Sequence, residues 1–224
     1  MKKLILIVIF VALFCTPALA LPFLDFSTET NSASSWTLSS PDGINWTLSF
    51  GAGTIEVDSP LGDPVLNDLV DLPSMTLGII TDIGGNIVTA SLNPSGSLTI
   101  TPDGGGAPVM TATVGTGGSL YIGANYVAYS AVKDDLTVTN YIALYSTTID
   151  DFATYDAAGY DFDLSFTGQA SGSTDLYVLL TGGVAGSASG TISGQMSITP
   201  EPATIALLGL GGLLLRRRKL RNIS

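Results

Sequence analysis

The chain has 224 residues, of which 46% are hydrophobic and only 12% are charged. It has no histidine and a single cysteine, Cys15, which excludes a Ser-His-Asp triad, a Cys-His pair and a histidine-ligated zinc site. Between Leu21 and Thr199 lie 18 of the 19 acidic residues (the other is Glu201) and one basic residue, Lys133. This region repels phosphate backbones, so we expect no nucleic-acid binding.

Residues 1–20 have the pattern of a secretory signal peptide with an apolar helix. Lys2 and Lys3 give a positive start, and an unbroken apolar run extends from Leu4 to Phe14. Ala18 and Ala20 are the small residues that signal peptidase requires, which predicts cleavage after Ala20. We therefore expect an exported protein with signal peptidase as its first partner.

Residues 21–198 are predicted to form one β-rich domain. In residues 45–50, Trp46, Leu48 and Phe50 alternate with polar residues, which is typical of a half-buried strand. Similar short runs recur about every ten residues, and no long helix is evident. The pattern predicts an all-β fold, an antiparallel β-sandwich of jelly-roll type with roughly ten to twelve short strands.

Turn residues separate these runs. Pro41-Asp42-Gly43 predicts an early hairpin, and Gly84-Gly85-Asn86 and Asn93-Pro94-Ser95-Gly96 predict two further turns. Residues 60–73 have a helical apolar spacing and are expected to form a short helical turn or a loop, whereas residues 175–182 are expected to form a strand. The Gly/Ser-rich residues 182–194 are either a last strand or partly a linker.

The C-terminal tail combines three elements in order. Pro200-Glu201-Pro202 separates the tail from the body, an apolar run of 13 residues follows over 203–215, and a basic cluster closes it. As a helix the run reaches about 20 Å, shorter than the ~30 Å of a typical hydrocarbon core. It is a marginal transmembrane helix, with the basic cluster on the cytoplasmic side. The basic cluster consists of Arg216, Arg217, Arg218 and Lys219.

Residues 199–219 closely resemble the PEP-CTERM sorting segment of exported bacterial proteins. The resemblance implies that Pro200, Glu201 and Pro202 are the recognition element and that Arg216 to Lys219 stop transfer through the inner membrane. It further implies processing by an exosortase, a membrane enzyme that removes the tail and passes the protein to the cell surface or extracellular matrix. The sorting tail is therefore assigned to residues 199–224, after a signal peptide over 1–20 and a body over 21–198.

Several aspartates of the body are calcium candidates, because hard cations prefer several oxygen ligands. No EF-hand spacing is present, so solvated acidic faces and turns are the alternative. We expect no other cofactor. The candidates are Asp150, Asp151, Asp156, Asp161 and Asp163, with Asp134 and Asp135 beside them.

Exposed aromatic side chains offer a second possibility, stacking on sugars. Tyr126 and Tyr129 have opposite parity in one predicted strand, so at most one of them can point outward. Paired carboxylates could run a glycosidase, but nothing singles out a pair among the many acids. We therefore expect a non-catalytic surface or matrix protein associated with extracellular polysaccharide. The alternatives are a carbohydrate- or calcium-binding module and, more distantly, a secreted glycoside hydrolase. The aromatic residues considered are Trp36, Trp46, Tyr121, Tyr126, Tyr129, Tyr141, Tyr145, Tyr155 and Tyr160.

Overall fold

The structure is a computed structural model that describes residues 21–116, 118–130 and 136–199. The described part contains fifteen strands and two helices, which confirms the predicted all-β class. The helices are α2 (Thr147–Ala157) and α3 (Leu176–Thr181). The strands are β1 (Phe23–Thr28), β2 (Trp36–Ser40), β3 (Thr47–Phe50), β4 (Ile55–Ser59), β5 (Leu69–Asp71), β6 (Ser74–Leu77), β7 (Thr81–Gly84), β8 (Ile87–Ser95), β9 (Ser97–Thr101), β10 (Met110–Val114), β11 (Ser119–Ile122), β12 (Tyr126–Ser130), β13 (Leu136–Tyr141), β14 (Asp161–Ala170) and β15 (Gly186–Thr199).

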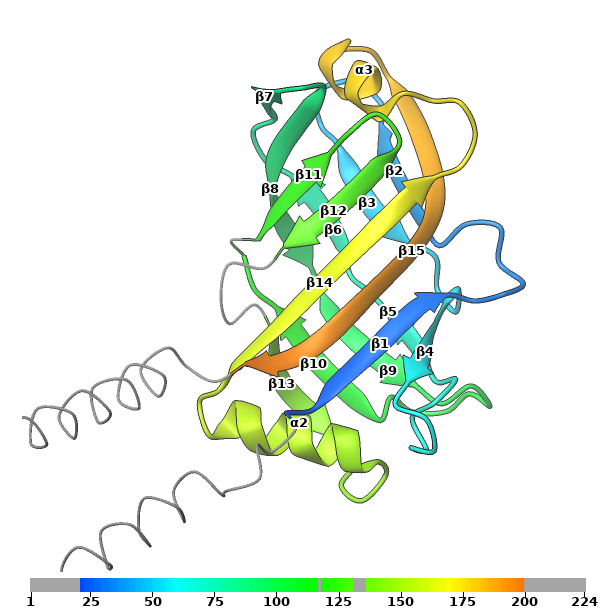
Figure 1. Cartoon of the computed structure of the whole chain (residues 1–224), viewed down its shortest axis with the longest axis vertical. Coiled ribbons are helices and arrows are strands. Elements are labelled where there is room, and N and C mark those ends of the chain that lie inside the picture. Colours follow the sequence, from blue (N-terminus) through cyan, green and yellow to red (C-terminus); the bar gives the residue numbers. More distant parts are fainter. Residues whose placement is uncertain (1–20, 117, 131–135, 200–224) are drawn as a thin grey trace, which may run out of the picture.

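The antiparallel strands form one sheet that closes on itself (Figure 1). Eight of them form a closed barrel in the order β2-β3-β6-β8-β11-β12-β14-β15, and the pairing of β15 with β2 completes the ring. From β15 the sheet also continues through β1, β4, β5, β9, β10 and β13. The predicted sandwich is therefore corrected, because β2, at one end of the sheet, pairs with β15 and closes eight strands into a ring instead of forming the edge of one of two facing sheets.

Strand β15 is the central strand of the molecule. One edge pairs with β14 along residues 190–199, and the other edge pairs first with β2 and then with β1. The Gly/Ser-rich segment is thus a strand, and glycine is needed in it for close packing. A Cβ atom at Gly190 would collide with the carbonyl oxygen of Gln169 and would lie 2.8 Å from the ring of Trp36.

Strand β8 continues almost directly into β9, so the turn predicted at residues 93–96 is wrong. Residues 92–95 pair with β6 instead. The hydroxyl of Ser95 donates to the carbonyl of Ser74 at 3.0 Å, which ties the two strands together. Tertiary pairing therefore overrides the local turn chemistry of Asn93-Pro94.

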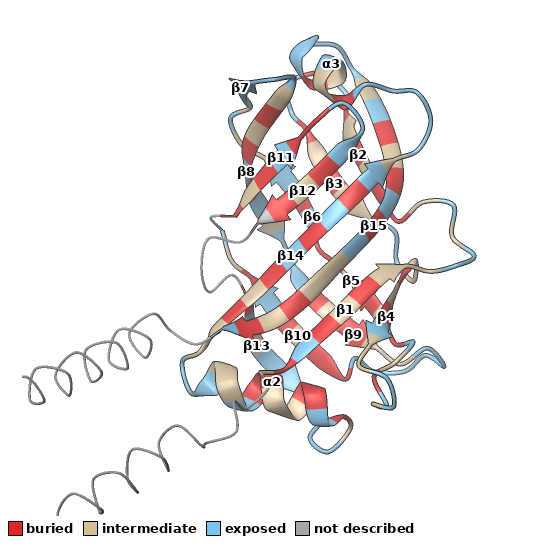
Figure 2. Cartoon of the chain, in the orientation of Figure 1, coloured by how far each residue is buried: buried red, intermediate tan, exposed pale blue. Residues whose placement is uncertain are grey.

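The core fills the interior with alternate side chains of the strands (Figure 2). Along β14, Phe162, Leu164 and Phe166 are buried, as the alternation predicts. The Phe162 ring stacks on Phe152 of α2 with a centroid distance of 4.7 Å, so the helix is packed onto the same core as the sheet. At the other end of the barrel, α3 buries Leu176 and Leu180.

Both helices begin at side-chain caps. Ser146 accepts a hydrogen bond from the amide of Ile149 at 3.3 Å, and Asp175 accepts one from the amide of Val178 at 3.1 Å. The strand predicted over 175–182 is wrong. Residues 176–181 form α3 instead, because the side chain of Asp175 caps a helix there. Of residues 60–73, which were expected to form a helical turn or a loop, residues 60–67 form turns, whereas Leu69–Asp71 form strand β5.

The membrane-related predictions concern segments beyond the described residues. The signal helix with Ala18 and Ala20, and the C-terminal apolar run, both lie outside them. Neither α2 nor α3, the helices that the structure describes, has the length and apolar character needed to cross a membrane.

Candidate functional site

The outer face of β14 and β15 carries a ladder of uncharged polar side chains. Even-numbered residues of both strands point into the core, and odd-numbered residues point to the outside. Register therefore places hydroxyl and amide groups side by side on a rigid pair of strands. Three outward pairs are uncharged, namely Ser165 with Gln195, Thr167 with Ser193, and Gln169 with Thr191, whereas the two nearest the C-terminal end of β15 pair Asp161 with Thr199 and Asp163 with Ser197.

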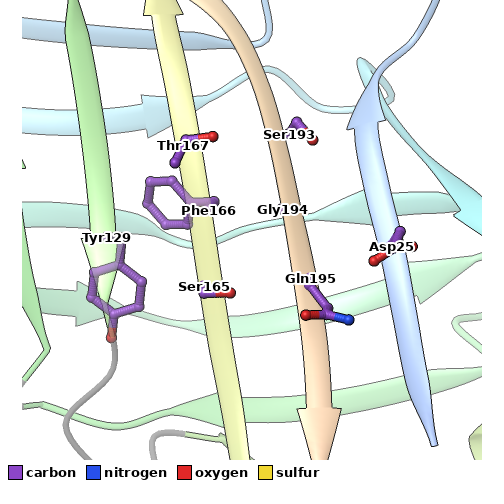
Figure 3. A pocket seen from close by; sticks show the side chains of 8 residues that line it. All are labelled: Asp25, Tyr129, Ser165, Phe166, Thr167, Ser193, Gly194 and Gln195. Atoms are coloured by element: carbon purple, nitrogen blue, oxygen red, sulfur yellow. The ribbon is translucent and has the colours of Figure 1, made fainter.

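This ladder carries two adjoining hollows, here together called the outer groove; Figure 3 shows the residues that line the first of them. The two hollows have volumes of about 290 Å³ and about 340 Å³ and share Thr167 and Ser193. Asp25 of β1 lines one hollow and Tyr126 of β12 lines the other. The groove thus runs across the outer face from an acidic end to an aromatic end.

Tyr126 gives the outer groove an exposed aromatic face. Its side chain is 37% exposed, and its ring lies against Gly123, where any larger residue would collide with it. Tyr121 on the next strand is 41% exposed, and it pairs with Ala128, two residues from Tyr126. A tyrosine ring offers an apolar surface together with a hydroxyl group, which suits a ligand with both kinds of surface.

The interior side of the same strands is closed by aromatic packing. Tyr129 is 4% exposed and stacks on Phe166 with a centroid distance of 5.1 Å. Tyr126 points outward and Tyr129 inward, which confirms the parity argument made from the sequence. Trp36 and Trp46 are both buried, so they are not available for stacking on a ligand.

The electrostatic character of the outer groove comes from Asp25 and its surroundings. Burial raises the pKa of the Asp25 carboxyl, and the nearby charge of Asp58 adds to the increase. None of the eight Lys and Arg residues lies in the part of the chain that the structure describes. When ionised, Asp25 disfavours anionic ligands at its end of the groove.

The calcium candidates do not come together in the structure. Asp150 accepts hydrogen bonds from the amide of Leu144, at 3.1 Å to each of its two oxygens. Asp156 accepts one from the amide of Val138 at 2.9 Å, which ties α2 to β13.

Asp151 lies on α2, and the two remaining candidates, Asp161 and Asp163, lie on β14. Asp163 accepts a hydrogen bond from the hydroxyl of Thr199 at 3.3 Å, and Asp161 lies opposite Thr199 in the ladder. Among residues 21–116, 118–130 and 136–199, no group of three acidic side chains is arranged to hold a metal ion. Asp134 and Asp135 lie outside the described residues.

Another buried acid, Asp68, has a structural role. It is 4% exposed and accepts a hydrogen bond from the hydroxyl of Tyr145 at 2.8 Å. Burial raises the pKa of Asp68, and burial together with the bond to Asp68 raises the pKa of Tyr145 to about 12. The pair holds the loop before α2 against the loop before β5.

The outer groove was not predicted, although its signal is present in the sequence. Ser, Thr and Gln alternate with core residues in both 161–170 and 186–199. What the sequence could not supply is the pairing of these two segments, which turns two polar stripes into one surface. The sorting residues predicted at 200–202 and 216–219 lie outside the described residues.

Comparison with known proteins identifies the class of the C-terminal segment. Residues 199–219 match the family model of the PEP-CTERM protein-sorting motif, which confirms the resemblance seen in the sequence. The motif implies an exported protein that exosortase processes, with transient membrane anchoring before display at the cell surface. No curated protein and no solved structure matches the chain.

Proposed function

We propose that the folded body is a non-catalytic surface or matrix protein that binds extracellular polysaccharide through the outer groove. The observation that carries this proposal is the continuous row of hydroxyl and amide side chains, with Tyr126 at one end. Sugar chains present hydroxyl groups that both donate and accept hydrogen bonds, and the groove offers groups of the same kind. A tyrosine face suits the apolar side of a sugar ring.

The shape of the outer groove also favours a chain ligand. Both hollows are open, and together they cross β12, β14, β15 and β1. A polymer can pass through an open groove without its ends being bound. The supporting strands are fixed by the longest ladder of the sheet, so little conformational entropy is lost when a ligand binds.

The export route supports the same proposal. A sorting motif that implies surface display brings the body to where extracellular polysaccharide is found. The described residues of the body include many acidic side chains and no Lys or Arg, which favours a neutral polysaccharide over an anionic one. The inference that the protein acts without catalysis rests on the groove, which offers binding groups along its length and no pair of carboxylates.

The test is binding of the full chain to extracellular polysaccharide purified from the same cells, measured by titration calorimetry. Tyr126→Ala is expected to weaken binding by roughly three- to tenfold, the range typical of one aromatic contact. Thr167→Val keeps the branched shape but removes a hydroxyl that lines both hollows, so it should also weaken binding.

Tyr141→Ala is the matched control, because Tyr141 is 41% exposed, close to the 37% of Tyr126, and lies on β13, outside the outer groove. It should leave binding unchanged. Equal affinities of the Tyr126 and Tyr141 variants would show that the groove is not the binding surface. If the unmodified chain does not bind the polysaccharide, the proposed function is wrong.

A further inference from the structure

Both ends of the described body leave it at the same end of the barrel, where α2 lies (Figure 1). β1 and β15 are antiparallel neighbours, with Phe23 opposite Ser197. The amide of Ile198 donates to the carbonyl of Pro22 at 3.3 Å, so the first and last strands are held together up to their ends. This end of the barrel is called the α2 end below.

The sorting motif begins where the sheet stops. β15 ends at Thr199, which is still paired with Asp161, and the motif match starts at residue 199. The apolar run of the motif starts at Ala203, four residues later. Four residues span at most about 14 Å when fully extended. The headgroup region on each side of a bilayer is roughly 5–8 Å thick. While the tail is in the membrane, the α2 end is therefore held at the lipid surface.

Three large apolar side chains are exposed at this same end. Leu61 is 87% exposed, Ile142 is 45% exposed and Leu144 is 93% exposed. Their two turns are tied to the first turn of α2. Asp63 accepts hydrogen bonds from the amide and hydroxyl of Thr148, and the amide of Leu144 donates to Asp150.

Leu144 stands out among the three. Its φ is 64°, in the left-handed region that favours glycine and is unfavourable for a leucine. The bond to Asp150 fixes this conformation, and it directs a large apolar side chain into the solvent. Nothing in the described fold uses the side chain, whereas an apolar surface outside the body would bury it.

From these observations we infer that the α2 end is a membrane-contact surface, which lies on the lipid interface while the tail anchors the protein. Leu61, Ile142 and Leu144 are its apolar contacts, and they enter the headgroup region as interfacial side chains do. Because the described body has acidic groups and no basic ones, the fitting surface is a zwitterionic bilayer. The contact keeps the body next to the membrane enzyme that processes the tail.

The test uses the full chain in phosphatidylcholine vesicles that contain nitroxide-labelled headgroups. In a Cys15→Ala background, a fluorophore is placed at Thr147→Cys on the α2 end or at Val184→Cys near α3, at the opposite end. Both positions are exposed. Quenching is expected to be strong at residue 147 and weak at residue 184. Equal quenching at both positions would overturn the inference.

A pair of double variants tests the apolar contacts separately from the tether. The double variant Leu61→Ser, Leu144→Ser should lower the ratio of molecules whose body touches the bilayer to molecules whose body does not by roughly tenfold. Quenching at residue 147 should fall accordingly. Ile44→Ser with Ile83→Ser is the matched control, since these residues are 76% and 53% exposed and belong to other loops and strands. Unchanged quenching in the leucine double variant would refute the contact.

Discussion

Replacing Gly190 by alanine tests how tightly β14 and β15 are packed. Gly190 is buried in β15 and pairs with Ala170 on one side and with Trp36 on the other. An added Cβ would collide with the carbonyl oxygen of Gln169 and would lie 2.8 Å from Cζ2 of Trp36. Neither group can move freely, because one is backbone and the other is a buried ring.

The size of the effect follows from these two contacts. Overpacking of a filled core costs about 1–3 kcal/mol. A shift of the Trp36 ring would also weaken its 2.8 Å hydrogen bond to the carbonyl of Thr191, which is worth about 1 kcal/mol. We expect Gly190→Ala to lower the free energy of unfolding by about 3 kcal/mol, equivalent to a fall of roughly 6–12 °C in Tm for a domain of this size.

The assay is thermal unfolding of the full chain followed by circular dichroism. Gly104→Ala is the matched control, because Gly104 lies in an exposed turn with no atom within 4 Å of the added Cβ. The control should change the free energy of unfolding by less than about 1 kcal/mol. If both variants melt at the same temperature, the packing argument for the central strand is wrong.

Two further predictions concern the loops around α2. The pKa of Asp63 lies below its usual 3.8: burial acts to raise it, but hydrogen bonds from Ser146, Val65 and Thr148 outweigh burial. The charged carboxylate therefore stabilises the fold above pH 3.8, and Asp63→Ala should lower the free energy of unfolding by about 1–2 kcal/mol near neutral pH. In urea titrations this difference should vanish as the pH falls through the folded-state pKa; a pH-independent difference would contradict the role of the charge. Leu144→Gly should raise the free energy of unfolding by about 1 kcal/mol, since glycine adopts a φ of 64° without strain; a loss in the same titration would contradict this.

Local patterns in the sequence were enough to predict several elements. Asp42 accepts hydrogen bonds from the amides of Ile44 and Asn45 at 2.9 and 2.8 Å, so the turn at residues 41–43 could be predicted from one side chain. The alternation around Trp46 and Leu48 likewise gave the correct buried face of β3. These features depend on neighbours in the chain, which the sequence displays directly.

The closure of the sheet depends on contacts that the sequence does not display. β2 and β15 pair although about 150 residues separate them, and each strand alone is equally compatible with a sandwich edge. The helix α2 was missed although local signals for it are present. Ser146 is its N-cap, and the buried Ile149, Phe152 and Ala153 follow helical spacing, but the segment is rich in Thr and Asp, which are weak helix formers. A search for an N-cap serine before that spacing would have found it.

The candidate site was predictable only in its parts. Parity alone showed that Tyr126 and Tyr129 cannot both point outward, whereas the outer groove requires β12, β14, β15 and β1 to lie side by side. The sorting motif is the opposite case. Its information lies in a short linear order of residues, so the sequence was sufficient to identify it.

The position of β15 in the chain has a consequence for how an exported protein of this design acquires its shape. β15 is the last described strand, yet β1, β2 and β14 all pair with it. A chain that crosses a membrane from its N-terminus delivers β1 and β2 long before their partner arrives. Their free edges stay open until β15 emerges, and such edges invite pairing with other chains. Because the sorting motif follows β15 immediately, a tail that halts in the membrane would hold each chain in place at the moment its barrel can close.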